Sequence, residues 1–295
     1  MTLNETTLLD IVIPDRRHDY AESDLILYAL ALGYGEDPLD ERALRYCYEK
    51  ALRPAPTAPL VLAHPGFWMR DLDTGIDWRQ IVHLDQSLEI LGSIPISGAV
   101  IGKTRVLDVL DRGIGRGAIV RFERTLMDEA SGEIIARMTQ SNLCRADGGF
   151  SGREAPSAIR KRVPDRSPDS IIKVATRPET ALLYRLSADL NPLHADPASA
   201  RQSGFPKPIL HGLATFGIVC RALIKSRCDY DGSCLSHIAA RFTGIVYPGD
   251  TLSVELWDDT GDVRFRARVP DRDVIVVDDG VAALRSDQES EGSSI

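Results

Sequence analysis

The spacing of hydrophobic positions changes several times along the chain, and each change predicts a different element. Residues 22–33 are rich in Leu and Ala, with helix-capping side chains near their start and a glycine at their end, which predicts a helix. A second helix is expected to begin near Pro38 and to run through residues 40–52. Residues 53–65 hold four prolines, so this segment is predicted to be extended and irregular.

The next part of the chain has the β-rich pattern of antiparallel strands, each bounded by Gly, Pro or Asp. Four strands are predicted, at residues 79–91, 98–111, 116–127 and 132–144. A G-x-G-x-G sequence at residues 113–117 lies between the second and third of them. It lacks the G-x-G-x-x-G spacing and the following helix of a nucleotide-binding loop, so a hairpin turn is the favoured interpretation.

A linker is predicted next, because residues 146–170 are rich in Gly, Pro, Ser and charge. We therefore expect one domain at residues 1–150, a linker at 151–170, a second domain at 171–285 and a disordered tail at 286–295.

The second half of the chain repeats the order of the first, with helical segments followed by strands. Residues 171–177 predict a short strand, residues 178–187 a helix, and residues 212–226 a helix that is apolar on nearly all faces and therefore buried. Four more strands are predicted, at residues 236–247, 250–258, 262–269 and 273–284. This recurrence predicts an α+β protein of two related units, with a curved antiparallel sheet around the buried helix.

Charge and cysteine content narrow the possible functions. The 295 residues include 35 Lys plus Arg and 43 Asp plus Glu, a net charge of −8, which argues against nucleic-acid or membrane-surface binding but not against an anionic small ligand. The five cysteines form no C-x-x-C pair, which favours free thiols and a cytoplasmic location. No segment approaches the ~18 apolar residues of a membrane span.

The densest polar cluster in an apolar context lies at residues 183–200. Pro192 restricts the backbone there, so that Asp189 and His194 are held across a stiff bend, as a carboxylate and an imidazole that act as general acid and base would be. The alternative is structural: Asp189 and Asn191 cap turns, and His194 satisfies a backbone carbonyl group. Composition alone leaves both interpretations open.

A second cluster precedes the buried helix. Gly212 follows His211, and its N–H at the helix N-terminus is suited to a carbonyl oxygen that gains negative charge. The alternative is that Gly212 is needed only for helix packing.

The remaining histidines give weaker signals. His83 lies in a predicted strand and is a candidate pocket residue, whereas His18, His64 and His237 are expected to be structural or at the surface. No histidine pair has zinc-ligand or iron-ligand spacing with a carboxylate, so no metal site is expected.

The residues 189–194, Asp-Leu-Asn-Pro-Leu-His, followed by Asp196 and Pro197, resemble the hydratase 2 motif of MaoC-like enoyl-CoA hydratases. Further segments are similar, in the same order, to the (R)-specific 2-enoyl-CoA hydratase domain of peroxisomal multifunctional enzyme type 2 and to bacterial stand-alone relatives. They are residues 28–33, 82–86, 184–197, 208–217 and 240–252. The resemblance covers roughly residues 15–285.

This resemblance implies a double hot dog fold, two sheets each wrapped around a helix, with catalysis in the C-terminal unit and space for the acyl chain in the N-terminal unit. It implies that Asp189 and His194 are catalytic and that Asn191 is an active-site polar residue. The site residues implied for the substrate are Gly212 as backbone donor to the thioester oxygen, and His83, Leu84, Arg112 and Phe242 as contacts of the acyl-CoA. Leu84 replaces a commonly small residue and Arg112 a common Lys, which bears on chain-length preference.

The implied activity is reversible hydration of trans-2-enoyl-CoA to (3R)-3-hydroxyacyl-CoA, as in fatty acid β-oxidation. It requires no cofactor, since CoA is part of the substrate, and the family resemblance favours a homodimer. Lys207, Arg201 and Arg241 are candidates for the CoA phosphates, although Lys207 is equally well explained as a solvated surface lysine. The alternatives are a thioesterase or biosynthetic dehydratase of the same fold, and a non-catalytic acyl-CoA-binding subunit.

Overall fold

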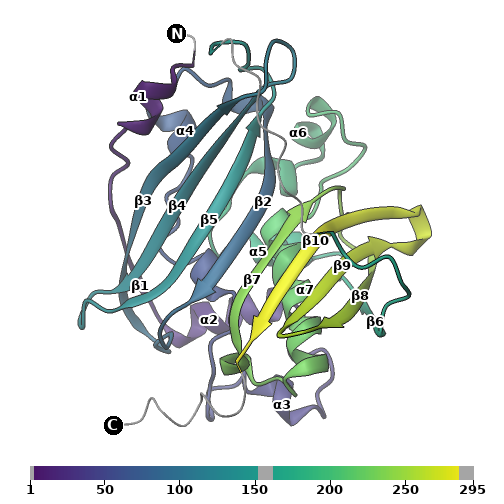
Figure 1. The fold of residues 1–295 in the computed structure, drawn as a ribbon. Helices are drawn as coiled ribbons and strands as arrows, with labels where there is room; N and C mark the ends of the chain where they lie inside the picture. Colours follow the sequence, from purple (N-terminus) through teal and green to yellow (C-terminus); the bar gives the residue numbers. More distant parts are fainter. Residues whose placement is uncertain (1–2, 152–161, 286–295) are drawn as a thin grey trace.

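One antiparallel sheet runs through the whole molecule. The computed structural model describes residues 3–151 and 162–285, so the predicted tail at 286–295 and half of the predicted linker lie outside the described residues. Ten strands pair in the order β1-β3-β4-β5-β2-β7-β10-β9-β8-β6 (Figure 1). The strands are β1 (Arg16–Tyr20), β2 (Ile81–Ile90), β3 (Gly98–Asp111), β4 (Ala118–Asp128), β5 (Ile134–Cys144), β6 (Ser170–Ala175), β7 (Leu235–Phe242), β8 (Thr251–Asp259), β9 (Asp262–Val269) and β10 (Val274–Leu284).

The two halves of this sheet have the same topology. Read from the outer strand inward, the first half is β1-β3-β4-β5-β2 and the second is β6-β8-β9-β10-β7, so each places its strands in the order first, third, fourth, fifth, second. The halves meet where β2 pairs with β7, from Asp85 opposite Arg241 to Glu89 opposite His237. The identical strand order supports two related units, while the boundaries at residues 150 and 171 stay a prediction.

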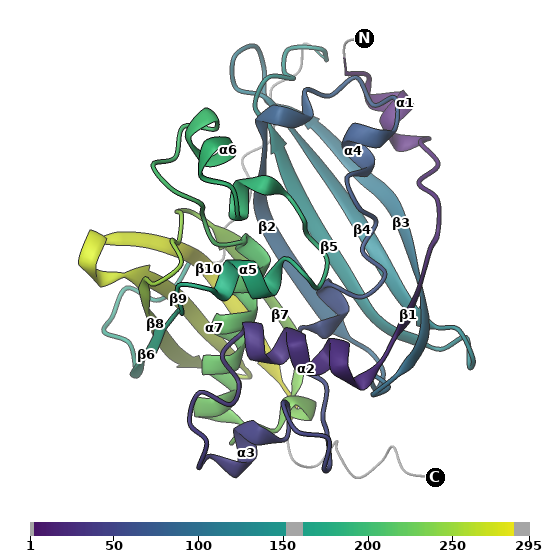
Figure 2. The same cartoon turned by 180° about the vertical axis from the view of Figure 1, so that it is seen from behind.

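The main helices lie on one side of the sheet, as the two opposite views show (Figures 1 and 2). The α-helices are α1 (Glu5–Leu9), α2 (Glu22–Ala31), α3 (Glu41–Leu44), α4 (Trp68–Asp71), α5 (Thr180–Tyr184), α6 (Pro197–Gln202) and α7 (Gly212–Arg227). The 3₁₀ turns are η1 (Ala58–Leu60), η2 (Trp78–Gln80), η3 (Pro192–His194), η4 (Gly232–Cys234) and η5 (Pro270–Arg272).

The helix α7 is the core of the second half, as its all-round apolar sequence predicts. Every side chain from Ala214 to Ile224 is buried, and the helix contacts β6, β7 and β8. Burial of this many apolar groups is the main stabilisation that a helix of such sequence receives. The longest helix among the described residues of the first half is the shorter α2, which contacts α5.

An irregular segment, residues 53–66, completes the cover of the first half, and a buried arginine of β4 holds it. The Arg124 guanidinium donates to the carbonyl groups of Pro59 and Leu60 at 2.8 Å and of Leu62 at 3.1 Å. Its side chain is 5% exposed, so these carbonyl groups take the place of water around a buried cation.

The predicted strands are confirmed, and so is the hairpin at residues 113–117. Gly113, Gly115 and Gly117 adopt positive φ between β3 and β4, which glycine tolerates without a steric penalty. The prediction of a helix through residues 40–52 is wrong, because only Glu41–Leu44 is helical. Beyond it the chain turns so that the ring of Tyr46 enters the core, where its hydroxyl donates to the carbonyl group of Tyr230 at 2.6 Å.

The predicted helix at residues 178–187 is also shorter than expected. It ends as α5 at Tyr184, and residues 185–188 turn the chain toward Asp189. Pro197 is the first residue of α6, and the Asp196 carboxylate accepts hydrogen bonds from the N–H groups of Ala198 and Ser199 at 3.0 Å, as a helix-capping side chain does.

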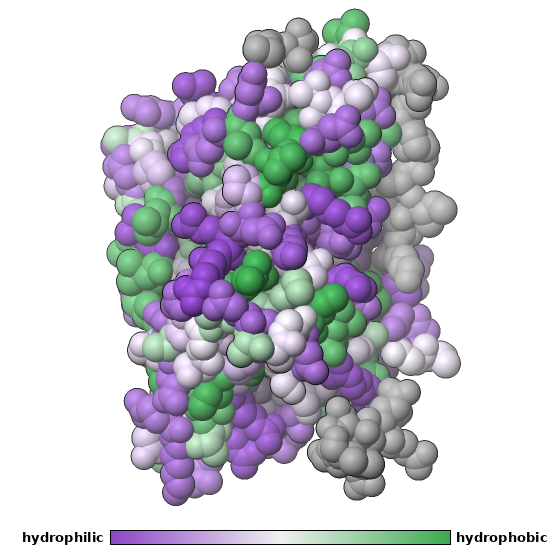
Figure 3. All heavy atoms as spheres, turned by 90° about the vertical axis from the view of Figure 1, so that its left-hand side faces the viewer, coloured by the Kyte–Doolittle hydropathy of each residue, from purple (hydrophilic) through white to green (hydrophobic). Residues whose placement is uncertain are grey.

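The surface carries both apolar and hydrophilic side chains. On the side seen in Figure 3, apolar areas are interrupted by hydrophilic ones. Among residues 3–151 and 162–285, no helix combines the length and apolar character needed to cross a bilayer.

Candidate active site

The loop between α5 and α6 is shaped by short-range hydrogen bonds. The Asp189 carboxylate accepts the Asn191 N–H at 3.0 Å, and the Asn191 side-chain oxygen accepts the Leu193 N–H at 3.1 Å. Pro192 then begins η3, which ends at His194. Both Asp189 and Asn191 therefore cap turns, as the structural alternative states, and these caps also make the stiff bend that the sequence predicts.

His194 is buried, at 8% exposure, and its two ring nitrogens have different surroundings. Its Nδ1 lies 2.9 Å from the carbonyl oxygen of Ile209. Since a carbonyl group only accepts, Nδ1 carries the proton and Nε2 keeps a lone pair. That Nε2 lies 3.9 Å from Oδ2 of Asp189, too far for a direct hydrogen bond but close enough for one water molecule to contact both atoms.

Burial also decides the charge of this imidazole. It lowers the pKa of His194 below its ordinary value of 6.5, while the carbonyl group of Ile209 and the carboxylate of Asp189 act in the opposite direction. We therefore take His194 as neutral near pH 7, with Nε2 able to accept a proton.

The ring of His211 packs against this pair. It is 2% exposed and stacks on His194 with centroids 3.6 Å apart and planes 27° apart. Its Nε2 lies 3.2 Å from the carbonyl oxygen of Asp189, and its Nδ1 is buried without a hydrogen-bond partner among the described residues. Burial, with the charge of His194 as the second cause, lowers the pKa of His211 to about 3. The sequence predicts no role for the His211 side chain beyond its place next to Gly212.

Asp189, His194 and His211 also form a possible metal-ligand group, with atoms within 4.8 Å of one another. The expectation of no metal site rested on spacing along the chain, which could not foresee that two loops would bring these residues together. Their arrangement fits a metal ion poorly. Two imidazole rings that share an ion direct their lone pairs to one point, whereas these rings are stacked, and Nε2 of His211 is bonded to a carbonyl oxygen.

Gly212 begins α7, directly after the stacked ring. The N-cap residue His211 makes no side-chain hydrogen bond to the first turn of the helix. A Cβ added to Gly212 would lie 3.5 Å from the ring of Phe242, an ordinary van der Waals contact. Packing alone therefore does not require glycine here, which weakens the packing alternative.

A β-bulge brings His83 to the same place. His83 pairs with Asn142 and Asp85 with Ser141, which leaves Leu84 as an extra residue in β2. Such a bulge re-aims side chains, and the ring of His83 meets the ring of Phe242 at 4.7 Å. Burial lowers the pKa of His83 to about 4, and the charge of Asp189 opposes this shift.

Two predicted cations lie away from this group. Arg112 lies in the hairpin after β3, three strands from β2 and so about 14 Å across the sheet, and donates to the carbonyl group of Arg116. Arg241 alternates with Phe242 along β7, so it lies on the opposite face, in register with Asp85 of β2. Within one chain, neither arginine adjoins the acid–base pair.

The other two candidates for the CoA phosphates are exposed at the surface. The ammonium group of Lys207 lies 4.9 Å from the centre of the Tyr247 ring, a cation–π contact. Arg201 is exposed on α6.

His64 lies nearer to the candidate site than its sequence context predicts. It was expected to be structural or at the surface, and it lies in the irregular segment held by Arg124. Its pKa is lowered to about 3 by burial first and by the charge of Arg124 next, while Asp189 raises it. His64 is thus close enough to feel the Asp189 carboxylate, although one histidine in a proline-rich segment gave no signal of this.

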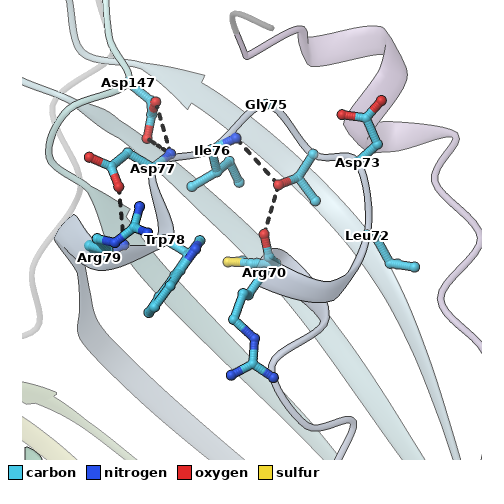
Figure 4. A pocket seen from close by; sticks show the side chains of 11 residues that line it. Arg70, Leu72, Asp73, Gly75, Ile76, Asp77, Trp78, Arg79 and Asp147 are labelled. Carbon is cyan, nitrogen blue, oxygen red and sulfur yellow. Dashed lines mark hydrogen bonds between the residues drawn. The ribbon is translucent and has the colours of Figure 1, made fainter.

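A cavity of about 490 Å³ lies apart from these residues, lined by residues 69–70 and 72–79 and by Asp147 (Figure 4). The guanidinium groups of Arg79 and Arg70 lie 4.7 and 5.9 Å from the centre of the Trp78 ring. The lining contains three carboxylates and two guanidinium groups and none of the predicted site residues. Its charges do not favour an anionic ligand, so we place the candidate chemistry at the loop between α5 and α6 instead.

Two family models match this chain, one in each half. The model described as "MFE-2 hydratase 2 N-terminal domain" matches residues 18–146, and the model described as "MaoC like domain" matches residues 160–278.

Individual relatives are similar over nearly the full length. The enoyl-CoA hydratase ChsH3 of Mycobacterium tuberculosis is 34% identical, covering 95% of this chain and 98% of that protein. The peroxisomal enoyl-CoA hydratase 2 of Arabidopsis thaliana is 32% identical, covering 93% of each. The crystal structure of a MaoC-like dehydratase from Phytophthora capsici superposes with a TM-score of 0.85 at 29% identity, covering 97% of this chain and 100% of that one.

The fold prediction is confirmed by these structures. A protein of Mycobacterium tuberculosis whose structure is described as a double hotdog fold matches with a TM-score of 0.56 at 15% identity, over 92% of this chain and 93% of that one. The α+β double hot dog is thus the fold of this chain, and its two sheets are joined into one through β2 and β7.

Proposed function

The chain belongs to the family of MaoC-like dehydratases and hydratase 2 enzymes, a family of hydro-lyases that act on acyl thioesters, and we propose that it reversibly hydrates trans-2-enoyl-CoA to (3R)-3-hydroxyacyl-CoA. Enoyl-CoA hydratases at 32–34% identity over more than nine-tenths of the chain support the substrate class. The acyl group and the (3R) configuration belong to the proposal.

The observation that carries the proposal is the 3.9 Å separation of Oδ2 of Asp189 from the unprotonated Nε2 of His194. A water molecule held between them would lose a proton to the pair as its oxygen bonds to C3 of the enoyl group. The pair would return a proton to C2, so that one water is added in total. General acid–base groups of this kind contribute about 10²–10⁴ in rate.

The start of α7 would supply the second requirement, stabilisation of the thioester oxygen as it gains enolate character. The N–H of Gly212 is in the first turn of a 16-residue helix, where the N–H groups have no intrahelical partner and the helix dipole favours negative charge. One such donor typically contributes about 10²–10³ in rate.

The first half of the chain would hold the acyl group. In place of a long central helix it has the short α2 and the irregular segment at residues 53–66, and it contributes His83 and Leu84 from the bulge in β2. Phe242 packs between His83 and Gly212 and would line the same space. The acyl-binding role of residues 1–150 and the catalytic role of residues 171–285 are part of this proposal.

The contacts around Asp189 and His194 do not support every expectation drawn from the sequence. Arg112 lies outside the group of residues that supports the proposal, and Asn191 would act through the turn that it caps. The homodimer, the cytoplasmic location and a place in β-oxidation stay predictions.

The test is direct. The purified protein is given crotonyl-CoA and a longer trans-2-enoyl-CoA, loss of the conjugated thioester absorbance is followed, and the product alcohol is analysed for configuration. Asp189→Asn is expected to melt like the wild type, and His194→Ala, which removes a buried ring, is expected to stay folded at a lower melting temperature; both are expected to lose at least about 10²-fold in kcat/KM. Asp271→Asn, an exposed aspartate of η5, is the matched control for loss of a carboxylate. Wild-type rates in both site variants, or a (3S) product, would contradict the proposal.

The reverse reaction is the second candidate, favoured by the likeness to a solved MaoC-like dehydratase. The same pair would remove water from a 3-hydroxyacyl thioester, and the direction that runs is set by concentrations. Release of free thiol from a saturated acyl-CoA would instead indicate a thioesterase. Binding of acyl-CoA without turnover would indicate a non-catalytic subunit.

A further inference from the structure

His211 touches both members of the proposed acid–base pair and directly precedes Gly212. We propose that His211 is a positioning residue, which holds Asp189 and His194 at the distance needed to share one water molecule and fixes both to the start of α7. This inference rests on the proposed hydratase function and assigns a role to a side chain that does not itself meet the substrate.

The first contact positions Asp189. Nε2 of His211 donates to the backbone carbonyl oxygen of Asp189 at 3.2 Å. Asp189 lies in a segment without helix or strand between α5 and η3, so its backbone lacks the hydrogen bonds of regular structure. The bond therefore ties the aspartate to α7, which is the most deeply buried helix of the second half. Nδ1 of His211 keeps a lone pair and has no described partner, so a single bond sets the tautomer.

The second contact positions His194. The ring of His211 contacts two other rings: it is stacked on His194 with centroids 3.6 Å apart, and it is tilted by 46° against Tyr184 with centroids 4.9 Å apart. Tyr184 is 1% exposed, and its own ring packs against Tyr28. A ring enclosed in this way cannot change rotamer without disturbing the core, so the plane of His194 is fixed from one face while its Nδ1 is fixed by Ile209.

The charges around these rings give His211 and His194 different protonation behaviour. The titratable groups that face His211 are His194, Asp189, Arg185 and Tyr184. Burial and the positive charges of His194 and Arg185 lower the pKa of His211 to about 3, so it stays neutral while His194 gains and loses a proton. His211 therefore supports the pair without competing for the transferred proton.

Two substitutions separate the two contacts. His211→Phe keeps an aromatic ring over His194 and removes the donor to Asp189, whereas His211→Gln keeps a donor near the position of Nε2 and removes the ring. His237→Gln is the matched control, because His237 lies at the far end of β7 from Phe242, five residues and so about 16 Å away.

The variants are compared by kcat, KM and the pH profile of kcat/KM. Small displacements of a reacting group cost about 10²-fold, so both variants are expected to lose about 10- to 100-fold in kcat with KM changed less than threefold. His211→Gln admits solvent to His194 and moves the acidic limb of the profile upward by at least half a pH unit, toward the ordinary histidine value. His211→Phe leaves that limb in place. A merely structural role would lower the melting temperature and leave the limb unmoved in both.

A second measurement does not depend on activity. In ¹⁵N-labelled protein without substrate, NMR reports the tautomer and titration of His194, assigned by its loss in His194→Ala. We expect the Nδ1–H form in the wild type and a raised midpoint in His211→Gln. If the wild type hydrates no enoyl-CoA but this shift is seen, the proposed function fails and the positioning role stands. If the enzyme is active and either folded variant keeps wild-type kcat, pH profile and His194 titration, the positioning role is wrong.

Discussion

Acid should weaken this fold through its buried histidines, and His211 allows the effect to be worked out. The perturbation is a fall in pH from 7.5 to 5.0. In the unfolded chain His211 titrates at its ordinary pKa of 6.5, whereas in the fold burial lowers the pKa to about 3. Unfolding therefore takes up a proton between these values, so the stability is complete above pH 6.5 and is lost as the pH falls toward 3.

The magnitude follows from 1.36 kcal/mol per pH unit. At pH 5.0 the chain is 1.5 units below 6.5, so His211 alone lowers the free energy of unfolding by about 2 kcal/mol. The result is insensitive to the pKa in the fold as long as that pKa stays below about 4. It is a large fraction of the 5–15 kcal/mol that typically separates folded from unfolded states.

The assay is urea unfolding at half-unit steps from pH 7.5 to 5.0 in wild type, His211→Phe and Tyr184→Phe. We expect the dependence of the unfolding free energy on pH to be about 1.4 kcal/mol per unit shallower in His211→Phe below pH 6. Tyr184→Phe perturbs the same stack but removes no group that titrates in this range, since burial raises the pKa of that phenol well above 10, so its slope should match the wild type. Equal slopes in all three proteins would refute the reasoning.

Three further substitutions test other parts of the structure. Arg124→Met leaves three buried carbonyl groups without their donor and should lower the unfolding free energy in urea by about 2–4 kcal/mol, and a loss below 1 kcal/mol would show that the segment is held otherwise. Gly212→Ala adds a methyl group at ordinary contact with Phe242, so thermal melting should change by less than about 2 °C, while the methyl group hinders approach of the thioester to the N–H and kcat/KM falls at least tenfold; an unchanged kcat/KM would contradict close approach of the thioester at this glycine. Gly280→Ala would place Cβ 2.4 Å from the carbonyl oxygen of Phe265, and a melting temperature unchanged from the wild type would contradict the expected loss of about 2–4 kcal/mol.

The sheet was predictable from sequence because its strands follow a simple rule. Alternation of side chains with period two marks a strand that buries one face, and β3, β4 and β9 keep that alternation over most of their length. The helix α7 was predictable for the opposite reason, since a segment that is apolar on every face has only the core to occupy.

The elements that failed are those whose ends are set by distant contacts. Residues 45–52 have helical propensity, but Tyr46 is drawn into the core by Tyr230 and a ring contact at 4.4 Å with Tyr34, which the local sequence does not encode. The shortening of α5 at Tyr184 has a similar cause, because that buried ring contacts the rings of Tyr28 and His211, which are distant in sequence.

In the candidate site too, some contacts could be predicted from the sequence and others could not. Asp189 and His194 are separated by one proline-stiffened turn, so their proximity could be inferred from the chain itself. His211 and His64 reach the pair from segments distant in sequence, and no spacing rule connects them. Arg112 illustrates the converse, since a residue placed at the site by resemblance lies three strands away within one chain.

The pairing of β2 with β7 has a consequence for how the protein unfolds. Both are interior strands, so neither half presents a free edge at the seam. Either half expressed alone would expose β2 or β7 as an edge strand with unpaired backbone groups. Such an edge can pair with another chain, so each half alone is expected to self-associate. The two halves should accordingly unfold together in one cooperative transition, and a destabilising substitution in the first half should also abolish the activity proposed for Asp189 and His194 in the second.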